Sequence, residues 1–230
     1  MATLGDLRLA LAGKLGFDII STSSTTSDIQ FLNNWANEGY LDVLLRTKCQ
    51  VESASLTLTN GTSEYALSTL GNSIVAVVEM YNAATSTSDV MERLPLEQLL
   101  RKRRAQGTSP TRYFSQQGSL LLLYPTPGTG ETLYAYVINR PGALSLSGDS
   151  MSAIPREYHK AVEYYMLWQG SEWDKRPERE IQRYQGSYEK RLAEIKKELR
   201  GLGGKRLAPI IPGARTKPLP PAIRSTDDGY

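Results

Sequence analysis

The 230-residue sequence carries few side chains of the kinds that do chemistry, because it contains one histidine, His159, and one cysteine, Cys49. A single cysteine forms no internal disulfide, and one histidine with one cysteine cannot complete a closed zinc site. Carboxylate-only metal sites, serine nucleophiles paired with lysine and paired-carboxylate catalysis remain open. The composition therefore argues against an enzyme without excluding one, and we expect no cofactor.

The best catalytic candidate is His159, because Glu163 follows four residues later and would share its face of a helix. A carboxylate in that position orients a histidine that acts as a general base. However, no nucleophile or oxyanion-stabilising group stands nearby, and His–Glu pairs at this spacing are common on helix surfaces. We expect a structural role for both residues. Cys49 lies beside Lys48, which would lower its pKa, but a place between a helix and a strand explains it equally well.

The densest charge is a run of four cations: Arg101, Lys102, Arg103 and Arg104. Such a run could neutralise DNA phosphates, with an affinity that falls steeply as salt rises. The alternative is a solvated helix end, where cations complement the negative end of the helix dipole. The run has no interleaved aromatic residues for stacking, and the net charge of the chain is only +3. We favour the helix end and keep the DNA contact as the alternative.

Residues 1–48 have helical spacing, which predicts two helices. The first is an amphipathic helix with leucines at positions 4, 7, 11 and 15, preceded by an imperfect capping box of Thr3 and Asp6. The second runs from a capping box of Ser27 and Gln30 to about Arg46. Two apolar stripes follow this second helix, which predicts that it is covered on two sides and central to a bundle. The stripes are Ile29, Leu32, Ala36, Tyr40 and Val43, and Phe31, Trp35, Leu41 and Leu45.

Residues 49–150 switch to the period of two that is typical of strands. Asn60-Gly61 is a strong hairpin signal between residues 55–59 and the alternating Tyr65 and Leu67. One helix interrupts the strands, from Pro95 into the basic run. We predict an antiparallel β-rich insertion with a sheet of five or six strands. Its further strands are expected at residues 74–80, 112–115, 120–124 and 132–138, with 112–115 and 120–124 forming a second hairpin.

Residues 151–200 return to helical spacing. One helix opens at Ile154-Pro155 and runs to about Trp173, and the next carries a narrow apolar seam that favours packing on one neighbour as an antiparallel hairpin. The seam consists of Ile181, Tyr184, Tyr188, Leu192, Ile195 and Leu199. Gly201 to Gly204 end the helix. The last 30 residues include five prolines and five glycines, too many for a packed core.

The predicted fold class is therefore α+β. A helical bundle of about four main helices, residues 1–48 and 151–200, is interrupted by the β-rich insertion at 49–150 and followed by an extended arm at 201–230. No stretch approaches the roughly 18 to 20 apolar residues of a membrane span, so we expect a soluble protein made in the cytoplasm.

Three segments resemble the head–tail adaptor proteins of tailed bacteriophages. Residues 35–43, W-A-N-E-G-Y-L-D-V, match the family's W-x-N-E-x-Y-x-D-V pattern. Residues 154–165 look like its I-P-x-x-Y-H-x-A-L-x-Y-Y helix start, and residues 184–192 are similar to its closing helix. The resemblance covers residues 1–48 and 150–200 well, the β-rich insertion only in character, and the arm not at all by motif.

The resemblance implies a non-enzymatic virion protein. Such adaptors form a ring, commonly of twelve subunits, that joins the portal to the tail or nozzle, while DNA passes through the lumen without being held. This places the protein in the virion neck, after synthesis in the host cytoplasm. The family's C-terminal arms often extend over the portal, and an extended Pro-rich segment loses little entropy on docking. The expected portal-docking residues are Pro209, Ile210, Ile211, Pro212, Arg215, Lys217, Pro218, Leu219, Pro220, Ile223 and Arg224.

Overall fold

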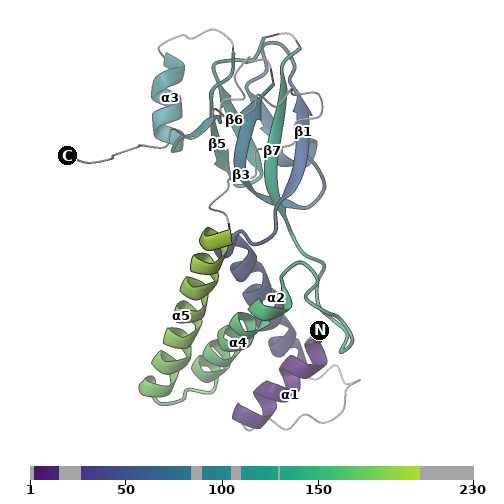
Figure 1. Ribbon diagram of the computed structural model, residues 1–230, viewed down its shortest axis with the longest axis vertical. Helices are drawn as coiled ribbons and strands as arrows, with labels where there is room; N and C mark the ends of the chain where they lie inside the picture. Colours follow the sequence, from purple (N-terminus) through teal and green to yellow (C-terminus); the bar gives the residue numbers. More distant parts are fainter. Residues whose placement is uncertain (1–2, 16–26, 84–89, 105–109, 129, 203–230) are drawn as a thin grey trace, which may run out of the picture.

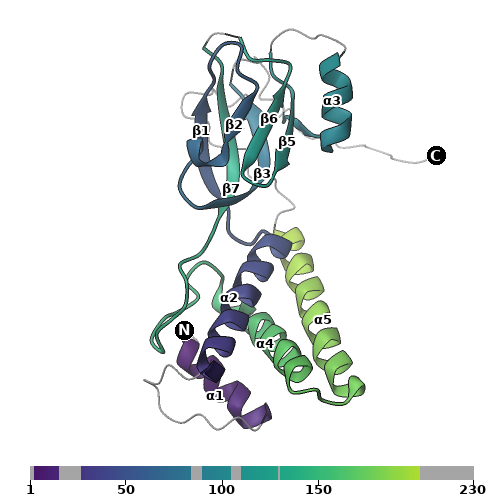
Figure 2. The same cartoon turned by 180° about the vertical axis from the view of Figure 1, so that it is seen from behind.

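The protein is an elongated molecule with helices at one end and strands at the other, as Figures 1 and 2 show from opposite sides. A computed structural model describes residues 3–15, 27–83, 90–104, 110–128 and 130–202. The predicted α+β class is confirmed. Four main helices form a bundle: α1 (Leu4–Leu15), α2 (Ser27–Thr47), α4 (His159–Trp173) and α5 (Glu178–Leu202).

The capping box expected at the start of α1 is present. The Asp6 carboxylate accepts hydrogen bonds from the backbone N–H and the hydroxyl of Thr3, at 2.8 and 2.9 Å. In return, the Asp6 N–H donates to Thr3 Oγ1 at 3.2 Å. These bonds satisfy donors that a helix start otherwise leaves unpaired. The four leucines of the predicted α1 stripe are all buried.

α2 packs against the other three bundle helices, as its predicted central place requires, but it shares this place with α4. α4 packs against the other three bundle helices, and its inward residues Ala161, Val162, Met166 and Leu167 are fully buried. The second apolar stripe of α2 is only partly covered, because Trp35 is buried while Phe31 remains 41% exposed. The predicted antiparallel hairpin of α4 and α5 is confirmed, with the two helices joined at one end of the bundle (Figure 1).

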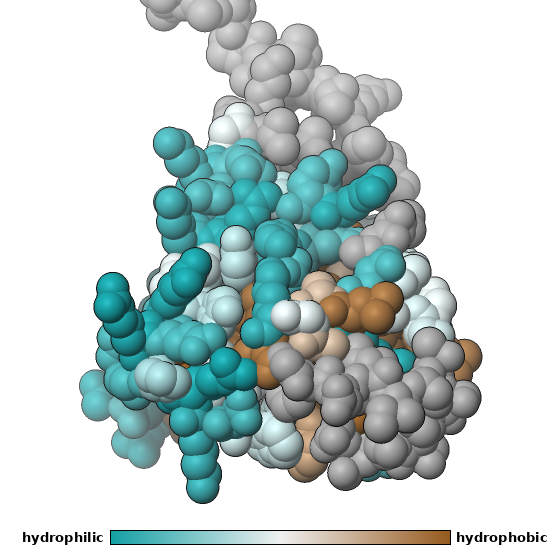
Figure 3. Space-filling model, turned by 90° about the horizontal axis from the view of Figure 1, so that it is seen from below, coloured by the Kyte–Doolittle hydropathy of each residue, from teal (hydrophilic) through white to brown (hydrophobic). Residues whose placement is uncertain are grey.

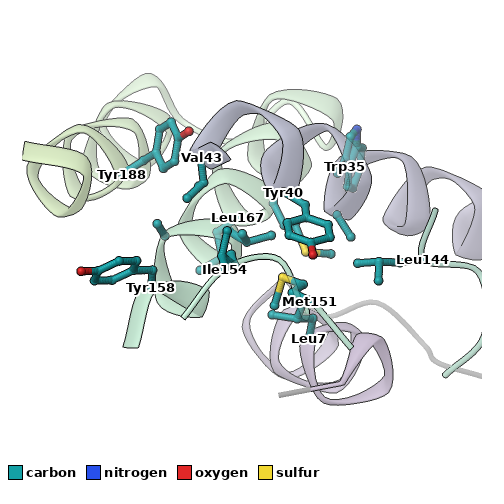
Figure 4. Packing of buried hydrophobic residues seen from close by; sticks show 14 of the residues in the cluster. Leu7, Trp35, Tyr40, Val43, Leu144, Met151, Ile154, Tyr158, Leu167 and Tyr188 are labelled. Carbon is teal, nitrogen blue, oxygen red and sulfur yellow. The ribbon is translucent and has the colours of Figure 1, made fainter. Parts of the chain in front are cut away.

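The bundle core also receives side chains from the segment between the strands and α4. Leu144, Met151 and Ile154 point into the same core as Leu7 of α1 and Tyr40 of α2 (Figure 4). A 3-10 turn, Arg156–Tyr158, then leads into α4. The segment therefore closes the bundle on the side of α1.

The strands form two sheets that face each other across a hydrophobic core, rather than the single sheet expected from the sequence. One sheet has the order β1-β7-β3 and is antiparallel; the other has the order β2-β6-β5-β4, in which β4 is parallel to β5. The helix α3 (Leu96–Arg104) lies beside β5 (Figure 1). The strands are β1 (Glu52–Thr57), β2 (Glu64–Ala66), β3 (Ile74–Asn82), β4 (Glu92–Arg93), β5 (Tyr113–Gln117), β6 (Leu120–Tyr124) and β7 (Thr132–Asn139).

The hairpin predicted at Asn60-Gly61 is wrong. The turn itself forms, with Gly61 at a φ of 77°, but β1 pairs with β7 and β2 pairs with β6, so the chain crosses between the sheets. Leu56 on β1 and Tyr65 on β2 are buried in one core. Crossing lets these two strands cover that core from opposite sides, which a hairpin within one sheet would prevent.

The other strand predictions are confirmed. β5 and β6 form the expected hairpin, β3 and β7 occupy the expected β-branched and tyrosine-alternating runs, and α3 starts directly after Pro95. The sandwich contacts the bundle at its lower end, where Ile138 of β7 belongs to the bundle core and Ala76 and Val78 of β3 pack against it.

Candidate interaction surfaces

The basic run on α3 is divided by the fold into two inward and two outward cations. Arg103 lies across the start of β2: it donates to the backbone oxygen and hydroxyl of Ser63 at 3.1 and 2.9 Å and pairs with Glu64 at 3.1 Å. Lys102 stands over the ring of Tyr113, 4.3 Å from its centre. These two cations hold α3 on the sandwich.

The outward cations of α3 are Arg101 and Arg104, which are exposed and make no hydrogen bond or ion pair within the described part of the chain. Leu100, directly before Arg101, is 42% exposed, while Leu99 is fully buried against Leu122 and Tyr124. Only half of the run is therefore available to a partner, which is fewer charges than the sequence suggested for a phosphate contact.

The catalytic pair considered in the sequence does not form. His159 is buried, and its Nε2 lies 3.2 Å from the carbonyl oxygen of Ile154. Glu163 instead accepts from Lys14 at 2.6 Å and from Lys160 at 2.7 Å. Burial of the Glu163 carboxyl opposes its ionisation, but the two lysines outweigh that effect and lower its pKa. Glu163 therefore ties α4 to α1 through Lys14.

Cys49 lies at the junction between α2 and β1, where burial raises the pKa of its thiol. A thiol held in its neutral form is a poor nucleophile. Within the described ranges, no three acidic, histidine or cysteine side chains gather closely enough to hold a metal ion.

A polar cluster joins α2 to α5. Tyr188 is fully buried and its hydroxyl donates to Asp42, and burial together with that carboxylate raises the pKa of Tyr188. Arg46 makes two 2.7 Å hydrogen bonds to the carboxylate of Glu189 and lies over the Tyr188 ring at 5.8 Å. Bidentate arginine–carboxylate pairs fix geometry as well as adding energy. The cluster therefore sets how α5 lies on α2.

An aromatic patch lies at the end of the bundle away from the sandwich. Phe31 and Trp35 of α2 meet Trp173 of α4, with ring centres 5.7 to 6.2 Å apart. Phe31 is 41% exposed and Trp173 is 48% exposed. Figure 3 views this end of the molecule, where hydrophilic atoms cover one side and hydrophobic atoms reach the surface near the centre. Exposed large aromatic residues mark protein interfaces more often than open surface.

Family comparison identifies the kind of protein that carries these surfaces. The family model of the SU10 adaptor protein matches residues 2–211, which span the bundle and the sandwich together. The chain belongs to the SU10 adaptor protein family. No curated protein matches the sequence.

The family is one of phage head–tail adaptors, so the resemblance seen in α2, α4 and α5 is confirmed. This adaptor is therefore a structural protein of a bacteriophage, and its family implies a place in the virion neck and contacts with portal and tail proteins. Among the described helices of the adaptor, none has the length and apolar run needed to cross a bilayer.

The portal-docking residues expected in the arm of the adaptor, from Pro209 to Arg224, lie outside the described residues. The structure adds residues that the sequence did not single out. Phe31 belongs to a stripe that the sequence predicts to be covered, and Trp173 to the predicted end of a helix. Both are exposed in the structure, because their exposure depends on how α2 and α4 cross. The Asp42–Tyr188 bond joins residues 146 positions apart, a separation for which one sequence gives no signal.

Proposed function

We propose that this adaptor forms a ring, of twelve copies by resemblance to its family, that joins the portal to the tail or nozzle and encloses the channel for DNA. The observation that carries the proposal is the family match, which extends from residue 2 to residue 211 and includes both structural halves. The nearly balanced charge supports it too, because a channel protein must let DNA pass without holding it.

Within this proposal the two halves have different tasks. The bundle, residues 1–48 and 151–200, assembles the ring, for which the exposed Phe31 and Trp173 offer an apolar contact between neighbouring copies. The insertion, residues 49–150, faces the tail component. The arm, residues 201–230, grips the portal and starts where α5 ends, close to the junction of bundle and sandwich (Figure 1).

The arms act together. One arm offers apolar anchors such as Ile210, Ile211 and Leu219 beside the cations Arg215 and Lys217, a composition that suits a modest contact with a polar rim. In a ring, each further arm binds as an intramolecular event, so many weak contacts add up to a durable joint.

Truncation tests the role of the arm. A chain that ends after Leu202 keeps every described helix and strand, so we expect it to fold as the full chain does and to lose binding to the purified portal. Circular dichroism checks the fold, and sedimentation with portal measures the binding. A second variant, Ile210→Asp with Ile211→Asp, keeps the length and is expected to weaken binding as well. Undiminished portal binding by the truncated chain would contradict the role of the arm.

The alternative function is sequence-independent DNA binding through α3, favoured by the exposure of Arg101 and Arg104. Binding of duplex DNA measured at rising salt separates the two functions. With two contacts the logarithm of the affinity falls with a slope of roughly −2 against the logarithm of the salt concentration. Under the adaptor proposal, Arg101→Ala with Arg104→Ala leaves portal binding unchanged.

A further inference from the structure

The two sheets have four edges, of which three are short or covered and one is open. Unpaired strand edges are sites where other chains add, and proteins commonly shorten or cover them. In the second sheet, the edge strands β2 and β4 have only three and two residues, and Arg103 lies over the start of β2. These two edges offer little backbone to a new strand.

The β3 edge of the first sheet is covered by side chains and by a neighbouring segment. The amide of Gln116 accepts from the N–H of Val77 and donates to the oxygen of Val75, both at 2.9 Å. Further along, the N–H of Met91 donates to the oxygen of Met80 at 2.8 Å. Gln116 mimics a strand's own hydrogen bonds, so this edge is already occupied.

The opposite edge of the same sheet is β1, which has six residues and no such cover. The backbone N–H of Leu58 donates to the backbone oxygen of Glu131 at 2.8 Å. Because hydrogen-bonded pairs alternate along an antiparallel ladder, Glu52, Ala54 and Leu56 also bond to β7. The residues between them direct their N–H and C=O groups away from β7. We name these outward backbone groups the β1 edge; they belong to Ser53, Ser55 and Thr57.

Within the described part of the chain, no hydrogen bond reaches the β1 edge. Its side chains are exposed and small, and none is the lysine, proline or inward charge that usually protects an edge. Just before it, Val51 is 41% exposed. A six-residue edge strand that is open and without protecting residues suits the addition of a strand, in which backbone hydrogen bonds supply the affinity.

The surface beside the β1 edge shows what the added strand meets. On the outer face of the sheet, Ser53 and Ser55 stand opposite Tyr136 and Tyr134 of β7, and Tyr136 packs edge-on against Tyr81 of β3 at 5.9 Å. Tyrosine offers a large contact with a polar tip and is frequent at protein interfaces. On the inner face the added strand would extend the core beside Leu56. The site therefore fits a proline-free strand that alternates apolar and polar residues.

We propose that the β1 edge binds an extended strand of the tail-side partner, which joins the first sheet as a fourth strand next to β1. This inference rests on the proposed function, in which the sandwich faces the tail, and it names the mode of that contact. A second copy of this chain is a less suitable occupant, because its corresponding edge is another β1 and the pairing of two equal edges gives closed dimers rather than a ring.

The substitution Ser55→Pro tests the inference, because the N–H that proline removes points away from β7 and takes no part in the ladder. The matched control is Ser55→Ala, which keeps the backbone donor. The probe is the tail complex of the same phage, purified without this protein. We expect Ser55→Pro to bind it at least about tenfold more weakly than the wild type, and Ser55→Ala to bind within about twofold.

Hydrogen exchange gives an independent measurement if the proline variant folds poorly. The amides of Ser53, Ser55 and Thr57 should exchange rapidly in the free protein and slowly in the complex with tails. Unchanged exchange at these amides, or wild-type binding by a folded Ser55→Pro variant, would overturn the inference. A wild-type dimer that Ser55→Pro abolishes would overturn it too, because the occupant would then be a second copy.

Portal binding, measured in parallel, keeps the two proposals apart. A chain that binds tails through the β1 edge but never binds portal contradicts the portal half of the proposed function and supports the inference. A chain that binds portal, and binds tails equally well with Ser55→Pro, contradicts the inference alone.

Discussion

The bundle and the sandwich are stabilised in different ways. The bundle unites the two ends of the described chain, and side-chain bonds cross between them: Asp42 to Tyr188, Arg46 to Glu189 and Lys14 to Glu163. The sandwich comes from one continuous stretch, residues 52–139, and uses side chains mainly to satisfy backbone groups, as Gln116 does for β3.

This difference shows where each half can meet other molecules. In the bundle, polar pairs fix the angles between helices that come from distant parts of the chain. Its exposed aromatic patch, Phe31 and Trp173, remains available for contacts with other molecules. The sandwich closes three of its four sheet edges and leaves β1 open. We infer that the bundle contributes a rigid shape and the sandwich a site for addition of another chain.

Paired core substitutions test most strongly whether the halves are separate. Leu192 in the bundle and Leu133 in the sandwich are both fully buried, and changing either to alanine is expected to cost about 2–5 kcal/mol in the free energy of unfolding. Hydrogen exchange should speed up only among the helices for Leu192→Ala and only among the strands for Leu133→Ala. If each substitution loosens both halves equally, they form one cooperative unit.

The substitution Glu131→Gln tests the loops of the sandwich. The buried Glu131 carboxylate accepts from the Asn82 side chain at 2.7 Å, from the Thr111 N–H at 3.1 Å and from the Gly128 N–H at 2.7 Å. An amide has one acceptor atom, so at least one of these donors loses its partner, at a cost of about 1–3 kcal/mol. Denaturant unfolding measures the loss, and the exposed Glu92→Gln serves as the control.

Removing the Tyr188 hydroxyl tests the side-chain locks of the bundle. Tyr188→Phe removes the hydroxyl that donates to Asp42. Asp42 is about one-third exposed and keeps Arg46 at 3.7 Å, so we expect a loss of about 1 kcal/mol. Tyr184→Phe, on the same helix, is the control, because no hydrogen bond of its hydroxyl exists within the described residues. Equal stability of the two variants in thermal unfolding would show that the hydrogen bond from Tyr188 to Asp42 does not stabilise the packing of α5 on α2.

Acid dependence is the smallest expected effect and concerns Glu163. Because its pKa is lowered in the folded state, the ionised carboxyl stabilises the fold above the unfolded pKa of about 4.3, and that contribution is lost as the pH falls through the folded pKa. Its lysine partners are about half exposed, so the contribution is below about 1 kcal/mol. Unfolding of wild type and Glu163→Gln should converge as the pH falls from 6 to 3; a constant difference would contradict the assignment.

The sequence predicted helices better than strand pairing, for physical reasons. The leucine spacing of α1 and the seam of α5 are local patterns. The fold buries the α1 leucines and the seam residues Tyr188, Leu192 and Ile195, and it leaves the rest of the seam half-buried. The Asn60-Gly61 turn was also local, and it formed. The sheet that β2 joins depends on the packing of Leu56 and Tyr65 in one core between the two sheets. No local sequence pattern encodes this packing.

The candidate surfaces were predictable only in part. The basic run was visible in the sequence, but only the fold shows that Arg103 and Lys102 face the sandwich while Arg101 and Arg104 face outward. The open β1 edge could not be predicted, because it depends on the order of the strands in the sheet. The alternating pattern of residues 53–57 would fit a central strand equally well. The His159–Glu163 spacing suggested a pair, and the closer lysines took the carboxylate instead.

The most direct test of the account is an electron-microscopy reconstruction of the neck of the virion. We predict a ring of this chain between portal and tail, with the arm from residue 201 onward lying on the portal and an extra strand beside Ser53, Ser55 and Thr57. A neck without this chain, or a chain in it whose arm lies on another component, would contradict the account.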